Sequence, residues 1–214
     1  LITEAAFAEM ENDFTAMLEE EFEAGRNYAV NKADWFEGKW SGMGRPHDDH
    51  EQRRADTGVS LEIFHEIGKA LTYIPENFRA HRTLKRTLSA KDKMFEEGVG
   101  FDWATGEALA FGALLKEGFN VRLSGQDCGR GTFSQRHSVF VDQKTENKYV
   151  PLNNLDDAGD YTVLDSPLSE YGVMGFEYGY SLAEPKTLTL WEGQFGDFAN
   201  GAQIMIDQFI SSGE

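Results

Sequence analysis

The sequence predicts an α/β fold, in which a mostly parallel sheet has helices on both faces and follows a helical connecting region. From Asp102 onward, helical and strand-like patterns alternate, which is typical of parallel strands joined by covering helices. Before that point the periodic segments are all helical. With 40% hydrophobic residues and 16 phenylalanines, the 214-residue chain can bury one sizeable core. We expect a helical connecting region over residues 1–99 and an α/β domain over residues 100–214.

Three helices are expected in the connecting region. Apolar residues recur at helical spacing from Thr3 to Gly25, with Thr3 placed to cap the helix. Ser60 is the expected cap of a second helix that ends before Pro75, and a third runs from about Glu76 to Glu96. Residues 27–57 are irregular and rich in Gly, Asp and Trp, so they predict a long ordered loop.

The α/β domain opens with a helix over Asp102 to Lys116, capped by Asp102. Further helices are expected over Pro167 to Ser181 and Asn200 to Ile210. The strand-like runs are Val121 to Leu123, His137 to Val141, Tyr161 to Leu164 and Thr187 to Trp191.

Charge excludes one class of partner. The 37 acidic and 20 basic side chains give a net charge of −17, which opposes binding to a phosphate backbone, so we expect no nucleic-acid partner. The window from Arg79 to Lys93 is locally basic, and a solvated helix face explains it more simply than a docking patch.

Cysteine usage and hydropathy indicate the compartment. The single cysteine, Cys128, rules out an intrachain disulfide framework and indicates a reducing environment. No apolar run approaches the roughly 20 residues needed to span a bilayer, and no signal-peptide pattern opens the chain. We expect a soluble intracellular protein with no membrane association. Because the first residue is Leu rather than Met, we expect an internal portion of a longer protein.

The segment LSGQDCGRGTFSQRH (residues 123–137) follows a predicted strand and contains three glycines. It has neither a GK[ST] sequence nor a G-x-G-x-x-G that opens a helix, so it does not predict nucleotide binding. Ligands gather beyond the carboxyl ends of strands in open α/β sheets. The polar side chains of this loop are consistent with a ligand site or with a salt-bridged turn, and they are Gln126, Asp127, Arg130, Arg136 and His137.

Three other features are weaker candidates for a functional site. His47 and His50 lie in a polar loop without a helix to fix their geometry, so we expect solvent exposure and predict no metal site. Glu107 lies at the edge of an apolar helix face, where a carboxylate reaches solvent or pairs with a base. Cys128 has no second cysteine and no adjacent histidine that could activate its thiol, so we predict no nucleophilic role for it.

The segment SPLSEYGVMGFEYGY (residues 166–180) contains the acid of greatest interest. Ser166 and Pro167 suit the N-cap and first helical position, which places Glu170 in the opening turn at the carboxyl edge of the sheet. A stripe of glycines follows and would allow close packing against another backbone. Glu170 is therefore either a surface acid that complements the helix dipole or a sequestered carboxylate that faces a ligand.

Three segments together resemble a known family: RLSGQDCGRGTFSQRHSVFVDQKT, DSPLSEYGVMGFEYGYS and LWEGQFGDFANGAQIMIDQFI. They are similar to the first, decarboxylating component of the 2-oxoglutarate dehydrogenase complex, and the resemblance covers about residues 60–214. It implies a thiamine diphosphate enzyme whose pyrimidine-binding domain is contained in this chain. In this family a glutamate hydrogen-bonds N1′ of the aminopyrimidine and promotes the imino tautomer that removes the thiazolium C2 proton.

The resemblance also implies roles for individual residues. The pattern P-L-x-E-x-x-x-x-G-F assigns the cofactor glutamate to Glu170. Phe195 and Phe198 match an aromatic pair that lines the pyrimidine pocket, with Phe198 the expected stacking partner. His137 matches a histidine of the active-site channel, and Asp127 lies on a loop near the thiazolium.

One family motif is missing. The diphosphate and Mg²⁺ motif, G-D-G followed by asparagines, has no counterpart, because Gly159-Asp160 continues as Tyr and Gly196-Asp197 as Phe. The Mg²⁺ ligands are therefore expected outside this chain, and the chain alone is expected to be inactive.

The resemblance implies an activity and partners for the whole enzyme. A homodimer would decarboxylate 2-oxoglutarate and pass the succinyl group to a lipoyl-bearing succinyltransferase, with dihydrolipoyl dehydrogenase as a further partner. Its location would be the bacterial cytoplasm or the mitochondrial matrix. Two alternatives remain open: a relative specific for 2-oxoadipate, and a non-catalytic assembly module that completes a neighbour's site.

Overall fold

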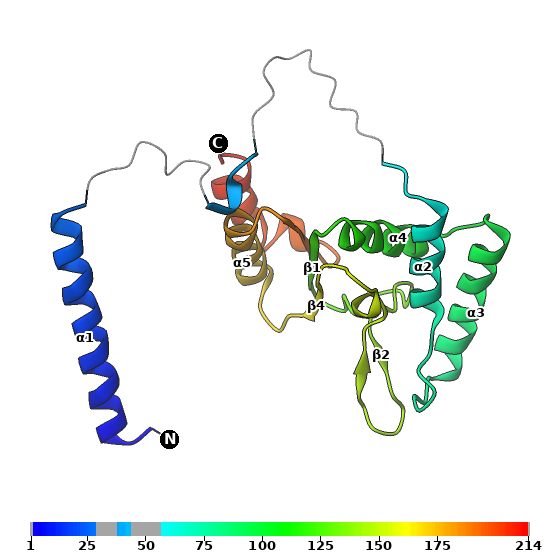
Figure 1. Ribbon diagram of the computed structural model, residues 1–214, viewed down its shortest axis with the longest axis horizontal. Helices are drawn as coiled ribbons and strands as arrows, with labels where there is room; N and C mark the ends of the chain where they lie inside the picture. Colours follow the sequence, from blue (N-terminus) through cyan, green and yellow to red (C-terminus); the bar gives the residue numbers. More distant parts are fainter. Residues whose placement is uncertain (1, 29–37, 44–56, 214) are drawn as a thin grey trace, which may run out of the picture. The chain divides into compact units, whose positions relative to one another are not determined.

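The computed structural model describes residues 2–28, 38–43 and 57–213 (Figure 1). The chain divides into two compact units, Leu1–Gly44 and Arg45–Glu214, and each is described by itself.

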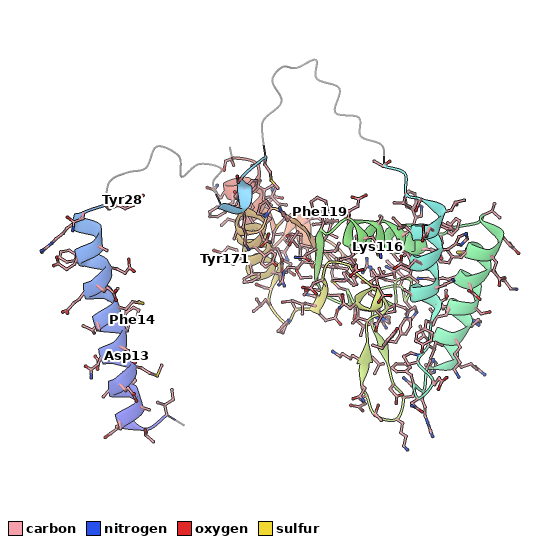
Figure 2. The ribbon with its side chains drawn as sticks, viewed as in Figure 1. Asp13, Phe14, Tyr28, Lys116, Phe119 and Tyr171 are labelled. Carbon is pink, nitrogen blue, oxygen red and sulfur yellow. The ribbon has the colours of Figure 1, made fainter. Side chains whose placement is uncertain are left out.

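The first unit contains the helix α1 (Glu4–Arg26) and a short 3-10 turn, η1 (Gly38–Trp40). The predicted cap is confirmed, because the Thr3 hydroxyl accepts a hydrogen bond from the Ala6 backbone N–H at 3.2 Å. No residue of α1 is buried, and Figure 2 shows its side chains, Phe14 among them, projecting from the helix.

Some predictions fall outside the described residues. His47 and His50 do, together with most of the predicted loop over residues 27–57. Within the described ranges, no helix is long and apolar enough to cross a membrane.

The second unit opens with α2 (Leu61–Thr72) and α3 (Arg82–Glu97). Ser60 caps α2 as predicted, with its hydroxyl accepting a hydrogen bond from the Ile63 N–H at 3.3 Å. The predicted start of the third helix, near Glu76, is wrong, because α3 begins at Arg82.

A later hairpin explains this late start. The strands β2 (Phe140–Val141) and β3 (Lys148–Tyr149) pair antiparallel and form a separate sheet. The Arg79 N–H donates to the Asp142 carboxylate, and the ring of Phe78 packs against Phe140 and Tyr149. These tertiary contacts hold the segment before α3 in a non-helical conformation and override its local helical preference. The predicted strand over residues 137–141 was too long, since only its last two residues pair.

Three parallel strands form the main sheet, in the order β4-β1-β5. They are β1 (Asn120–Gly125), β4 (Tyr161–Asp165) and β5 (Thr187–Glu192). Gly125 aligns with Asp165 on one side and with Glu192 on the other, so the three strands end at the same edge.

Helices cover both faces of this sheet, as predicted, and Figure 1 shows β1 between α4 (Trp103–Lys116) and α5 (Glu170–Ala183). Alternate residues of β1 point to opposite faces. On one face, buried Val121 and Leu123 join the main core, to which α4 contributes Phe111 and Leu115. Arg122 on the other face pairs with α5. The fold is therefore α/β with a parallel sheet, and the predicted cap of α4 is confirmed, since Asp102 accepts from the Thr105 N–H at 2.7 Å.

The end of α4 is fastened to its neighbours by Lys116, labelled in Figure 2. Its ammonium donates to Glu66 on α2 at 2.8 Å and to the Asp156 carbonyl at 2.7 Å. The helix α2 also packs on η2 (Pro151–Asn154), the turn that leads back toward β4.

Two boundaries near the carboxyl edge differ from the predictions. The N-cap of α5 is Ser169 rather than Ser166, because the Ser166 N–H instead donates to the Gly125 carbonyl at 2.7 Å and ends the strand region. The chain then ends in η3 (Asp197–Ala199), α6 (Gln203–Met205) and a π-helical turn (Ile206–Ile210), rather than in one helix over 200–210.

The glycine stripe of α5 does not meet another backbone within the described chain. A Cβ at Gly175 would lie 3.1 Å from the Met205 side chain, and a Cβ at Gly179 would meet nothing within 4 Å.

Candidate functional site

The candidate site lies at the carboxyl edge of the sheet, where β1, β4 and β5 end in register. Each strand is followed by a segment that carries predicted site residues. Asp127 and His137 follow β1, Glu170 follows β4, and Phe195 and Phe198 follow β5. The topology therefore brings all five predicted residues to one edge, which is where open α/β sheets bind ligands.

Glu170 is the first residue of α5 and is half-buried. Its carboxylate lies against Gly201, where a Cβ would approach Oε2 to 2.6 Å. In the part of the chain that the structure describes, this carboxylate has no hydrogen bond and no ion pair. A half-buried carboxylate without a protein partner is available to a ligand. Because Gly201 has no side chain, it leaves room for the Glu170 carboxylate.

The fully buried acid of α5 is Glu177, which has a structural partner. Its two oxygens accept from Arg122 Nε at 2.7 Å and from Arg122 Nη2 at 2.9 Å. The guanidinium of Arg122 also lies over the rings of Phe176 and Tyr180, 5.3 Å and 4.8 Å from their centroids. This bidentate pair fixes α5 on β1, so the two acids of the helix have different roles.

The loop after β1 is closed by its own backbone. The N–H groups of Arg136 and His137 both donate to the Arg130 carbonyl at 3.0 Å, and the Gly131 N–H donates to the Asp127 carbonyl at 2.7 Å. Asp127 and His137 have positive φ values of 57° and 53°, which are uncommon for residues other than glycine and indicate a tightly specified loop. The Asp127 carboxylate is exposed and pairs with Arg130 at 3.3 Å.

Arg136 is buried at the centre of this edge. It donates to the Glu107 carboxylate at 2.5 Å and 3.1 Å, to the Cys128 carbonyl at 3.0 Å, and to the Glu192 carboxylate. Burial by itself lowers the pKa of Arg136, but the hydrogen bonds and charges of Glu107 and Glu192 raise it above its ordinary value. Of the two alternatives for Glu107, reaching solvent or pairing with a base, the structure shows the pairing.

His137 is held next to this ion-pair cluster. Its Nε2 is buried and has no hydrogen-bond partner among the described residues. Burial lowers the pKa of His137, and the positive charges of Lys91 and Arg130 lower it further, so the imidazole is neutral at neutral pH. Lys91 is itself buried and donates to the Arg136 carbonyl at 3.3 Å. A buried polar nitrogen without a partner is uncommon in folded proteins, so it marks a position where a ligand could supply the missing hydrogen bond once the covering atoms move.

The rings of Phe195 and Phe198 stand at the surface. Phe195 is fully exposed and Phe198 is 60% exposed, and both line a hollow of about 360 Å³. Exposed Phe133 lines it too, a residue that sequence reasoning missed although it lies within the quoted loop motif. Gln194, which also lines this hollow, joins the two loops, because its Nε2 donates to the Gln126 carbonyl at 2.8 Å.

Cys128 is not a candidate nucleophile of this site. The thiol is buried, and burial together with the Glu192 charge raises its pKa to about 12, so it is protonated at neutral pH. No group of three or more His, Cys, Asp or Glu side chains in residues 2–28, 38–43 and 57–213 is arranged to hold a metal ion.

Comparison with known domain families matches residues 99–214 to the transketolase pyrimidine binding domain. The chain belongs to this family. In this transketolase-type pyrimidine-binding domain, the five predicted residues all follow the carboxyl ends of the parallel strands.

Similarity extends over the whole chain. It is 54% identical over 215 aligned residues to the 2-oxoglutarate dehydrogenase E1 component of Brucella canis, and 53% identical to the component of the same name from Brucella anthropi. The alignments cover 100% of this chain. They cover only 21% and 22% of the length of those two relatives. The chain thus spans about a fifth of their length.

Proposed function

We propose that this chain is the pyrimidine-binding part of a thiamine diphosphate-dependent 2-oxoglutarate dehydrogenase E1 component. One observation carries the proposal: the partnerless Glu170 carboxylate stands at the same edge as exposed aromatic rings, in a chain 54% identical to such components. Residues 1–99 would form the helical connecting region and residues 100–214 the cofactor-binding domain.

The residues at this edge suit the aminopyrimidine half of thiamine diphosphate. Such a ring offers a nitrogen to a carboxyl group and a flat face to an aromatic side chain. Glu170 supplies a carboxyl group without a protein partner, and Phe195 and Phe198 supply exposed rings. The diphosphate and its Mg²⁺ have no corresponding motif, since both Gly-Asp pairs continue with an aromatic residue, so we place those ligands outside this chain.

In this proposal the cofactor, when bound, supplies the nucleophilic carbon and the electron sink needed to release carbon dioxide from a 2-oxo acid. Glu170 holds and moves a proton at the pyrimidine N1′. The Phe198 ring stacks on the pyrimidine and Phe195 shields it from water. His137 hydrogen-bonds the substrate carboxylate through its free Nε2, and Asp127 lies near the thiazolium end.

We further propose that the whole protein works as a homodimer with a lipoyl-bearing succinyltransferase and dihydrolipoyl dehydrogenase. The name of the relatives, an E1 component, supports membership in a complex. Because those relatives are bacterial, we favour the cytoplasm over the mitochondrial matrix.

The test is carbon dioxide release from 2-oxoglutarate by the intact protein supplied with thiamine diphosphate and Mg²⁺. We expect turnover with 2-oxoglutarate to exceed that with 2-oxoadipate, and we expect none above the buffer background for this chain alone. Inactivity of the intact protein would contradict the proposal, and a preference for 2-oxoadipate would assign the chain to the related enzyme. A non-catalytic assembly module is favoured if the intact protein binds no cofactor in a calorimetric titration.

A further inference from the structure

Arg136 is the most extensively bonded side chain at the carboxyl edge, and it joins three segments. Its Nε and Nη2 reach Glu107 on α4, its Nη1 reaches the Cys128 carbonyl in the loop after β1, and Nη2 also reaches Glu192 at the end of β5. All three guanidinium nitrogens are therefore occupied. Four of its five N–H donors are used in these bonds, and the residue is only 7% exposed, so little of it faces a substrate.

Two of the segments that Arg136 joins carry or directly precede residues of the candidate site. His137 is the next residue, and its backbone N–H shares the Arg130 carbonyl with that of Arg136. On the other side, Glu192 is the last residue of β5 and directly precedes the loop with Phe195 and Phe198. A shift of the guanidinium relative to either carboxylate would move the imidazole relative to the aromatic rings.

The charges around Arg136 make this arrangement specific to arginine. Glu107 and Glu192 both approach one guanidinium, so its removal would leave two partly buried carboxylates facing each other. A lysine keeps the charge but has a single ammonium and cannot bond two carboxylates and a carbonyl in a planar fork. Neighbouring Lys91 does not substitute for it, since that ammonium is buried and bonded to the Arg136 carbonyl.

We propose that Arg136 is a positioning residue, which holds the His137 loop and the Phe195–Phe198 loop at a fixed separation without touching substrate or cofactor. The expected effect of Arg136 on cofactor affinity rests on the proposed function. The mechanical coupling of the two loops is a property of this chain alone and can be measured without a cofactor.

The test compares Arg136→Lys with Arg122→Lys in the intact protein, using hydrogen exchange without cofactor and calorimetric titration with thiamine diphosphate and Mg²⁺. Arg122 is a matched control, because it forms a buried bidentate pair with Glu177 on α5, whereas Arg136 pairs with Glu107 on α4. In Arg136→Lys we expect amides in both loops, 126–137 and 193–199, to exchange about 10-fold faster while β1 amides stay within about 2-fold. We also expect the cofactor Kd to rise about 10-fold, because two misplaced loops lose preorganised contacts. In Arg122→Lys the two loops should keep their wild-type exchange.

Acceleration of one loop only, of neither loop, or of β1 to the same extent would overturn the positioning role. If Arg136→Lys does not fold, Glu192→Gln keeps the shape and weakens one bond, and it should give the same two-loop pattern with smaller changes. Exchange confined to residues 193–199 in that variant would also overturn it. Failure of the wild-type protein to bind thiamine diphosphate contradicts the proposed function, whereas the exchange experiment still decides whether Arg136 couples the loops.

Discussion

The loop after β1 and the loop after β5 meet at the same edge of the sheet but are built differently. The first is closed by hydrogen bonds to the Arg130 carbonyl and anchored through buried Arg136, which keeps His137 half-buried. The second leaves the rings of Phe195 and Phe198 exposed, and among the described residues neither packs against another ring. Exposed aromatic surface is unfavourable in water, so it indicates a surface that a ligand or another part of the protein covers.

This difference predicts opposite responses to substitution. Changes to the bonded side chains of the first loop, above all Arg136, should alter the conformation of the protein itself, because these side chains hold neighbouring segments together. Changes to the exposed rings should alter binding and leave folding nearly unchanged, because surface side chains contribute little to stability.

The largest of the effects that test this contrast is expected for Phe198→Ala in the intact protein. Loss of a stacking ring should weaken thiamine diphosphate binding by about 5- to 10-fold, which corresponds to about 1 to 1.4 kcal/mol for an aromatic contact. The free energy of unfolding should change by less than about 0.5 kcal/mol. Calorimetric titration and urea denaturation measure the two quantities, and Phe133→Ala serves as the comparison on the same hollow. A large loss of stability with intact cofactor affinity would contradict the contrast.

A smaller effect, confined to substrate, is expected for His137→Ala. The free Nε2 is proposed to contact the substrate carboxylate, so kcat/KM for 2-oxoglutarate should fall about 10-fold or less, the range of a single hydrogen bond. Cofactor affinity should stay near that of the wild type. Steady-state kinetics with parallel cofactor titration separates the two, and weakened cofactor binding with unchanged substrate kinetics would reassign His137.

The smallest effect concerns pH. Burial lowers the pKa of His137 in the folded protein, so the unfolded chain binds more protons and stability decreases as pH falls below the ordinary histidine range near 6.5. His137→Gln removes this titration. The difference in unfolding free energy between wild type and variant should therefore shift against the wild type from pH 7.5 to about pH 5.5. Parallel pH profiles of the two proteins would show that folding does not lower the pKa of His137.

The sequence predicted those parts of the fold that depend on neighbouring residues. Caps at Thr3, Ser60 and Asp102 were found, because a capping side chain bonds an N–H three residues away. The start of α3 was missed, because the Arg79 N–H bonds Asp142, which is 63 residues away. The spacing of apolar and capping residues within one segment does not predict a contact with a distant segment.

The distance along the sequence between interacting residues also explains which parts of the site were predicted and which were not. The alternation of strands and helices predicted that the loop with Asp127 and His137 and the helix start with Glu170 lie at the carboxyl edge, whereas Phe195 and Phe198 were assigned from the family resemblance. Arg136 stood in the same loop, but its partners Glu107 and Glu192 lie 29 and 56 residues away. Its bridging position depends on how the strands are ordered, which the periodicity of the sequence does not specify.

The most direct test of the central claim is exchange of the C2 proton of bound thiamine diphosphate, followed by NMR in deuterated buffer, in the intact protein. Glu170→Gln keeps the shape of the side chain but cannot exchange a proton with the pyrimidine. We predict that exchange slows by roughly 10²- to 10⁴-fold, the scale of lost acid–base assistance, while folding and cofactor affinity stay near those of the wild type. Exchange as fast in Glu170→Gln as in the wild type would contradict the account and leave Glu170 as an acid at the end of a helix.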